Sequence, residues 1–141
     1  MQRVSMAMPF VPTPKGRPRF KCKYNRVFTY TPMATKRFEN QVASYYQEEG
    51  NGYQFPKGTP ITVSIEFGMP VPISTSKKKK EEMLRGAIHH TVKPDLDNLV
   101  KSILDALNGI AWYDDAQITE LHISKKYVQH PHIYITIHET E

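Results

Sequence analysis

The sequence predicts an α+β protein in which two main α-helices pack on one mixed β-sheet. The 141-residue chain has segments of alternating apolar and polar residues near both ends and in its middle, and such alternation is typical of strands. Two other segments repeat their apolar residues three and four positions apart, as amphipathic helices do. No internal repeat is present. We therefore expect one domain over residues 1–141, with two helices against a single sheet.

The first 30 residues are predicted to form a strand and then a basic hairpin. Residues 3–8 alternate weakly and can form the first strand. Three prolines between positions 9 and 14 exclude regular structure, so residues 15–20, Lys-Gly-Arg-Pro-Arg-Phe, are expected to form an exposed basic loop. Cationic and aromatic residues alternate over residues 19–30, with residues 24–26 as the expected hairpin tip.

A helix is predicted to follow. Thr31 is expected to be its N-cap and Pro32 its first helical residue. Gly50 is expected to end the helix in the left-handed conformation. The apolar stripe of this helix consists of Phe38, Val42, Tyr45 and Tyr46.

The second half of the chain is predicted to contain a strand, a loop, a helix and a closing hairpin. Residues 59–69 alternate cleanly and form the best strand. Residues 70–92 are too long and polar for an ordinary connection and are expected to be a mobile basic loop with one or two helical turns. An amphipathic helix is expected at 95–108, and residues 117–128 and 132–138 alternate as a closing β-hairpin.

The charge distribution favours an anionic partner. The formal net charge is +5 and the pI is about 9.3. Residues 1–38 contain nine Lys or Arg and no acid, whereas residues 39–141 contain ten cations and fourteen acids, a net charge of −4. Basic side chains are often only part of a solvated surface, but beside a nucleic-acid site they would contact phosphates. The candidates are Lys15, Arg17, Arg19, Lys21, Lys23, Lys36, Arg37, Lys77, Lys78, Lys79 and Lys80.

Cysteine content and hydropathy indicate a cytoplasmic protein without membrane association. Cys22 is the single cysteine, so no disulfide within the chain can form. No apolar run approaches the roughly 20 residues that span a bilayer, and the N-terminus lacks the apolar region of a signal peptide. The six histidines match no zinc-site spacing.

The segment around the second helix concentrates acidic residues in an otherwise basic protein. Asp95 and Asp97 lie at its start, and Asp114 and Asp115 follow its end. Carboxylates select hard divalent cations such as Mg²⁺, which completes its shell with water and phosphate oxygens. We therefore expect metal-assisted chemistry on a nucleic acid. The alternative for Asp95 and Asp97 is that acids favour the first turn of a helix.

Spacing refines this expectation. Asp97 and Lys101 are four residues apart, so they can contact the same ligand or each other. If the chain runs back along the helix, one of Asp114 and Asp115 could face the helix start across a few ångström, and the other would be a turn residue. Asp105 is expected to be an exposed helix residue.

The motifs Asp95-Leu-Asp-Asn-Leu-Val-Lys101 and Trp112-Tyr-Asp-Asp-Ala-Gln117 resemble those of the RusA family of Holliday junction resolvases, small endodeoxyribonucleases common in bacteria and their prophages. The basic Lys-Gly-Arg-Pro-Arg run and the Thr-Pro helix start are also similar to that family. The resemblance covers most of the chain, except for residues 70–92. It implies a RusA-like fold and a homodimer that cuts four-way DNA junctions at symmetric positions in recombination and repair.

The resemblance also implies the chemistry of the site. Asp95, Asp97 and Asp115 match the family's metal-site carboxylates, and Lys101 matches its catalytic lysine. The implied cofactor is Mg²⁺, with Mn²⁺ as a substitute, and no organic cofactor is expected. Two alternatives stay open: a non-catalytic DNA-binding module in which the acids only cap the helix, and a nuclease acting on flaps or other branched DNA.

Overall fold

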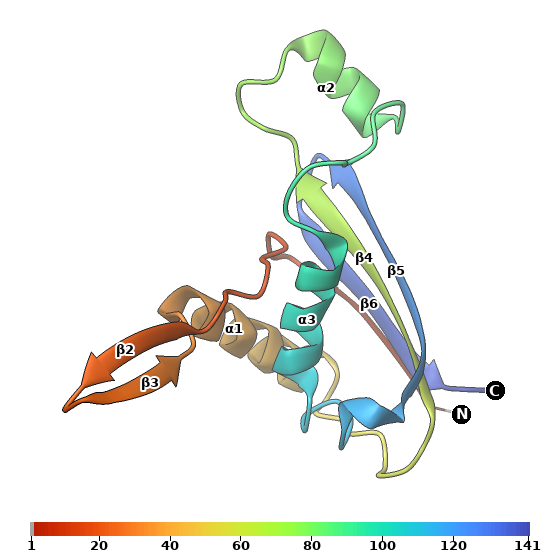
Figure 1. Ribbon diagram of the computed structural model, residues 1–141. Coiled ribbons are helices and arrows are strands. Elements are labelled where there is room, and N and C mark those ends of the chain that lie inside the picture. The colour runs from red at the N-terminus through yellow and green to blue at the C-terminus, as the bar shows by residue number, and fades with distance from the viewer. Residues whose placement is uncertain (1) are drawn as a thin grey trace.

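The computed structural model describes residues 2–141 and has the predicted α+β architecture. A four-stranded mixed sheet carries two helices on one face, and a two-stranded hairpin extends away from this body (Figure 1). In chain order the elements are β1 (Arg3–Met8), β2 (Arg19–Lys23), β3 (Arg26–Tyr30), α1 (Met33–Glu49), β4 (Ile61–Pro70), α2 (Lys77–Leu84), α3 (Leu96–Leu107), the short 3₁₀ helix η1 (Asp115–Gln117), β5 (Ile118–Val128) and β6 (His132–Glu139).

The strand order of the sheet is β1-β6-β4-β5, so the predicted closing hairpin is wrong. β4 lies between β5 and β6, parallel to β5 and antiparallel to β6. The connection of residues 129–131 can step over one strand, because strands lie about 4.8 Å apart and each extended residue spans about 3.4 Å. A Cβ on Gly68 would lie 2.7 Å from the His132 ring and 2.8 Å from Val128 Cγ2. The glycine therefore leaves room for this crossing.

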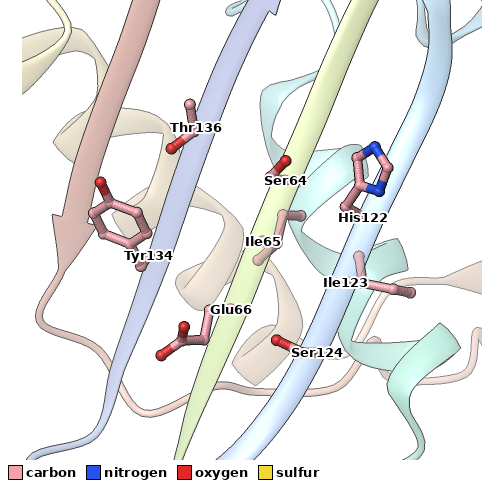
Figure 2. Close-up of a pocket in the computed structure, with 8 residues that line it drawn as sticks. All are labelled: Ser64, Ile65, Glu66, His122, Ile123, Ser124, Tyr134 and Thr136. Atoms are coloured by element: carbon pink, nitrogen blue, oxygen red, sulfur yellow. The ribbon is translucent and has the colours of Figure 1, made fainter.

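One face of the sheet carries polar side chains. Figure 2 shows a hollow on this face, crossed by β6, β4 and β5, with α3 behind the strands. Glu66 in this hollow pairs with Lys126 at 3.0 Å and lies 3.6 Å from His132. The other polar residues of the hollow are Ser64, His122, Ser124, Tyr134 and Thr136. The hollow lies across the sheet from α3, so it is separate from the predicted site.

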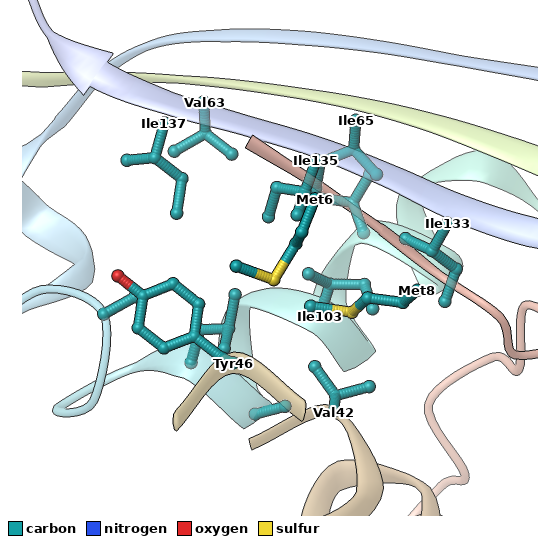
Figure 3. Close-up of a cluster of buried hydrophobic side chains, with 14 of the residues drawn as sticks. Met6, Met8, Val42, Tyr46, Val63, Ile65, Ile103, Ile133, Ile135 and Ile137 are labelled. Carbon is teal, nitrogen blue, oxygen red and sulfur yellow. The ribbon is translucent and has the colours of Figure 1, made fainter. Parts of the chain in front are cut away.

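The opposite face of the sheet carries the hydrophobic core, which α1 and α3 cover (Figure 3). Strand alternation places every second residue of β1 and β6 on this face, while most residues of the central strand β4 are buried. Tyr46 of α1 and Ile103 of α3 are fully buried against these strands. The sheet contributes Met6, Met8, Val63, Ile65, Ile133, Ile135 and Ile137. This packing fixes the position and orientation of α3.

The first helix has the predicted buried stripe, but both of its ends differ from expectation. Pro32 occupies the N-cap, one residue after the predicted cap at Thr31, and its carbonyl accepts the first helical bond from Lys36 N at 3.2 Å. Gly50 has φ −92° and is not left-handed, whereas Asn51 has φ +54°. Gly50 is required for space instead: a Cβ there would lie 2.8 Å from the Tyr46 carbonyl oxygen.

The predicted basic loop contains α2, in agreement with the one or two helical turns expected there. The Ser76 hydroxyl caps the helix by accepting a bond from Lys79 N at 3.3 Å, and Met83 is buried. The helix lies beyond one end of the sheet (Figure 1). Among residues 2–141, no helix combines the length and apolar character needed to cross a membrane.

Candidate active site and nucleic-acid surface

The start of α3 presents the acids and the lysine of the first motif. Asp95 occupies the N-cap position, but its carboxylate pairs with Lys93 Nζ at 3.0 Å. Asp97 lies in the first turn and Lys101 one turn later, and both are exposed. The apolar face of α3 is buried in the core, as predicted. The polar residues therefore form a stripe that faces away from the sheet.

The basic front segment is attached directly to this helix. Lys15 N donates to the Asn98 carbonyl oxygen at 3.2 Å, and the Ser102 hydroxyl donates to the Thr13 carbonyl oxygen at 2.8 Å. Ser102 is buried, so this second contact is shielded from solvent. The loop that carries Arg17 into β2 thus begins at the first two turns of α3, next to Asp97 and Lys101.

The Lys15 side chain anchors the loop. Its ammonium contacts Glu39 of α1 at 2.5 Å and Asp105 of α3 at 3.1 Å, and it is largely shielded from solvent. Burial by itself would lower the pKa of Lys15, but the bonds to Glu39 and Asp105 outweigh burial and raise it. The predicted contact of Lys15 with DNA would require it to leave both carboxylates. Asp105 is exposed as predicted, although it also holds this ammonium.

Asp115 lies at the other end of α3. Its carboxylate accepts a hydrogen bond from the indole Nε1 of Trp112 at 2.7 Å, and its backbone N–H donates to Asn108 Oδ1 at 3.1 Å. Burial raises the pKa of Asp115, and the nearby charges of Asp105 and Asp114 add to the increase, while the bond from Trp112 opposes it. A cation placed beside this carboxylate would stabilise its ionised form.

Asp114 has the turn role predicted for one member of the acidic pair. Its carboxylate accepts a bond from Ala116 N at 3.0 Å and caps η1. Gln117 completes the capping box, because its Oε1 accepts from Asp114 N at 2.9 Å and its Nε2 donates to the carbonyls of Pro56 and Thr59. The turn that carries Asp115 is therefore held rigidly.

A single chain does not bring the three predicted metal ligands together. Asp95 and Asp105 are ten residues apart, which corresponds to about 15 Å along the helix axis. Asp115 lies beside Asp105 and Asn108, away from the helix start. Within residues 2–141, no group of three acidic, histidine or cysteine side chains is close enough to hold a metal ion. The expected approach of Asp115 to Asp95 or Asp97 within one chain is therefore not found.

The β2–β3 hairpin forms an arm with a cationic and aromatic face. Every residue of both strands is exposed. Arg19 pairs with Tyr30, Lys21 with Phe28, and Lys23 with Arg26. Directly opposed residues share one face of a hairpin. This face therefore has cations that can bind phosphates and aromatic rings that can stack on bases. We refer to the β2–β3 hairpin as the arm.

The tip of the arm is a tight turn, as predicted. Tyr24 and Asn25 have φ values of +52° and +58°, as required at the two central residues of a type I′ turn. Tyr24 is 86% exposed, and Lys23 Nζ lies 5.4 Å from the centroid of its ring. The tip therefore ends in an unburied aromatic ring beside a cation.

The remaining predicted DNA-contacting residues lie in two places. Lys36 and Arg37 are exposed in the first turns of α1, close to the arm in sequence. The lysines 77–80 are exposed at the start of α2, at the end of the sheet (Figure 1). The exposed cations thus form two separate groups, one at the arm and the start of α1 and the other at α2 (Figure 1).

Comparison with known proteins identifies the family of this chain. The family model described as "Endodeoxyribonuclease RusA" matches residues 9–138, nearly the whole chain. The chain belongs to the RusA endodeoxyribonuclease family. It is also 34% identical over 128 residues to the uncharacterized protein YqaN of Bacillus subtilis (strain 168), an alignment that covers 91% of this chain and 90% of that protein.

Sequence reasoning missed how this RusA family chain holds Asp115. Trp112 had no assigned role: it is fully buried, and its indole N–H also binds the Asp115 carboxylate. Gln117 had no assigned role, although it fixes the whole turn. The available signal was the spacing in Trp-Tyr-Asp-Asp-Ala-Gln: an indole donor three residues before an acid, and a Gln at the N3 position after Asp114.

Proposed function

We propose that this RusA family protein is a Mg²⁺-dependent, structure-selective endodeoxyribonuclease that resolves four-way DNA junctions by paired symmetric nicks, in DNA recombination and repair. The observation that carries the proposal is the attachment of the basic segment to α3. Lys15 N bonds to Asn98 O, so the exposed Asp97 and Lys101 lie beside the root of a cationic arm. Carboxylates beside phosphate-seeking cations suit metal-assisted phosphodiester cleavage.

Asp95, Asp97 and Asp115 would hold the metal, since oxygen donors suit Mg²⁺ and Mn²⁺. A bound divalent ion would polarise the scissile phosphate and provide hydroxide at neutral pH. Lys101 would neutralise negative charge that develops on the reacting phosphate. Trp112 would orient the Asp115 carboxylate through its 2.7 Å hydrogen bond.

The separation of Asp115 from the helix start supports a homodimer in which two chains would complete each site. In a homodimer whose α3 helices run antiparallel across the two-fold axis, Asp115 of each subunit would lie beside Asp95 and Asp97 of the partner subunit. One such interface would create two equivalent sites at once. A four-way junction is itself two-fold symmetric, so two such sites match the two nicks that resolution needs.

The test is cleavage of a synthetic four-way junction, compared with a linear duplex and a flap of matched sequence. We expect Mg²⁺-dependent paired nicks on the junction. Chelation should abolish cleavage and leave junction binding largely intact, because binding depends on Lys and Arg. Asp97→Asn should do the same. Binding without cleavage under any metal condition would favour a non-catalytic module, and preferred cleavage of the flap would favour the other nuclease class.

A further inference from the structure

A small cavity lies where the segment after α2 crosses the end of β5. Its volume is about 220 Å³. The lining is strongly basic, and none of its residues is acidic. The end of α2 and the segment after it, between residues 83 and 90, supply one wall, and β5 supplies the other. The polar groups of the lining are Arg85, His89, His90, Lys125, Lys126 and Tyr127.

His90 is the unusual member of this lining. The residue is 8% exposed, and its ring packs on the Tyr127 ring with centroids 4.8 Å apart. Its Nδ1 is buried without a hydrogen-bond partner among the described residues. Burial of a ring nitrogen in this state is unfavourable unless a ligand or water supplies the missing bond. A polar group or a water molecule beside the ring would supply this bond.

The charges around His90 determine which ligand fits. Lys126 is neutralised by Glu66 at 3.0 Å, on the far side of the sheet. Lys125 Nζ donates to the carbonyls of Val92 and Pro94 at 2.8 and 2.9 Å, which leaves one of its three hydrogens free. Arg85 is exposed and has no ion pair within residues 2–141. The cavity thus retains uncompensated positive charge.

Together these groups form a donor set for an oxyanion. Burial lowers the pKa of His90, and the charge of Lys125 adds to this effect, so the ring is neutral near pH 7 and offers one N–H donor. A guanidinium, an ammonium and an imidazole N–H can each donate to a different oxygen of a tetrahedral anion. A metal cation would be repelled by the same groups.

We propose that this cavity binds a backbone phosphate of the DNA substrate. The proposal rests on the proposed function, because it takes DNA to be the substrate. Lys125 connects the cavity with the candidate active site, since its ammonium binds the carbonyl of the residue directly before Asp95. A phosphate held here would fix the register of the strand relative to α3, and the four lysines at the start of α2 would continue the contact along the backbone.

The first experiment uses the full-length protein with isotope-labelled histidine and inorganic phosphate as the probe. At constant pH and ionic strength, phosphate should shift the His90 ring resonances saturably, and sodium chloride should not. His122, on the polar face of the sheet, is the internal control and should not respond. The His90 signals can be assigned from their loss in His90→Asn.

The second experiment measures affinity for a four-way junction without divalent metal. His90→Phe, which removes the donor, should weaken binding several-fold, whereas His90→Asn, whose amide can replace Nδ1, should retain most of it. Arg85→Ala should weaken binding and lower the slope of log affinity against log salt by about 1. Arg85 is exposed, so this variant stays informative if His90→Phe does not fold. His122→Phe is the matched control and should bind normally.

Three outcomes would overturn the proposal. Normal junction binding by both His90→Phe and Arg85→Ala, with a saturable phosphate shift, would mean that the cavity takes free phosphate and not DNA. Normal binding without any phosphate shift would mean that water satisfies Nδ1. A response of His122 equal to that of His90 would mean non-specific ion effects. If wild-type protein binds no DNA but phosphate still shifts His90, the proposed function fails and the cavity remains an oxyanion site.

Discussion

At the scale of single residues, the candidate site depends on side chains that orient the acids. Asp115 illustrates this, because burial and the charges of Asp105 and Asp114 oppose its ionisation, whereas the Trp112 indole favours it. The carboxylate is therefore held in a defined direction and kept available for a cation. Because Trp112 is buried in the core, its indole N–H has a fixed position and holds the Asp115 carboxylate in place.

Trp112→Phe should reduce cleavage more than junction affinity. Loss of the indole hydrogen bond raises the pKa of Asp115 further, so the acidic limb of the pH–rate profile should move to higher pH. Stability should also fall by about 2 kcal/mol, because a buried ring shrinks and a charged acceptor loses its donor. Phe55→Leu is the matched control, since Phe55 is equally buried next to Trp112. If the acidic limb of the pH–rate profile moves equally in Phe55→Leu, Trp112 acts only by packing and not through its hydrogen bond.

A second residue-scale prediction concerns Tyr46 and alkaline stability. Burial raises the pKa of Tyr46 from 10.0 to about 12, with a smaller contribution from Tyr53, and its hydroxyl donates to the Tyr53 carbonyl. The unfolded chain therefore loses this proton near pH 10, whereas the folded chain keeps it until about pH 12. The contribution to stability is complete below pH 10 and is lost as pH rises through this window, by about 2 to 3 kcal/mol.

Tyr46→Phe removes this titration and should flatten the dependence of unfolding free energy on pH between 10 and 12. At neutral pH the variant should be less stable by about 1 kcal/mol, because the hydrogen bond to Tyr53 is lost. Denaturant titrations at several pH values measure both effects. The prediction is wrong if wild type and variant lose stability in parallel over this range.

At the scale of secondary-structure elements, sequence patterns predicted each strand and both core helices but not the pairing of the last strands. The apolar spacings of α1 and α3 are local, so their buried faces could be inferred. The position of β4 between β5 and β6 is not local. It depends on a three-residue crossing over Gly68, and the same short connection is equally compatible with a hairpin.

For the candidate site, as for the fold, the sequence predicted the local features but not the long-range ones. The placement of Asp97 and Lys101 one turn apart on α3 and the turn role of one aspartate follow from residue type and spacing. The metal-binding and catalytic roles stay predictions. The position of Asp115 at the far end of α3 does not follow from spacing, because the path of the chain after Asn108 is fixed by tertiary contacts. Gln117 binds the carbonyls of Pro56 and Thr59, about 60 residues earlier in the chain. Such contacts leave no local pattern.

The arm carries the element-scale prediction. Arg17, Arg19, Lys21 and Lys23 are exposed, and none of them has an ion pair among the described residues, so they should bind DNA by releasing counterions. Replacing Lys21 and Lys23 with Gln should weaken junction binding at low salt and reduce the salt slope by about 2. Because the arm lies outside the core, the unfolding temperature should not change. An unchanged slope would move the DNA path to the α2 lysines, for which Lys77→Gln with Lys78→Gln is the matched double variant.

At the scale of the whole molecule, the proposed metal site requires acids that one chain keeps apart. A single chain leaves Asp95 and Asp97 at one end of α3 and Asp115 at the other. In an antiparallel two-fold arrangement, the two sites would lie about one helix length apart, and each would take its lysine and first two acids from one subunit. Light scattering should then report about twice the 16.3 kDa chain mass.

Mixing two inactive variants tests whether the sites are shared. If Asp115 of one subunit completes the site of its partner, then Asp97→Asn and Asp115→Asn homodimers are both inactive. Their heterodimer, however, has one site with both defects and one site with neither, so mixing should restore nicking. Because only one site is intact, the heterodimer should nick junctions but rarely resolve them in one encounter.

Sites built within one chain give the opposite result, because each site of the heterodimer then carries one defect and mixing restores nothing. The matched control is Asp97→Asn mixed with Asp95→Asn. These two defects belong to the same half of the site in either arrangement, so this mixture should stay inactive. Subunit exchange can be verified by mass spectrometry before the assay. Restored nicking in the first mixture alone would establish that the dimer, and not the chain, is the catalytic unit.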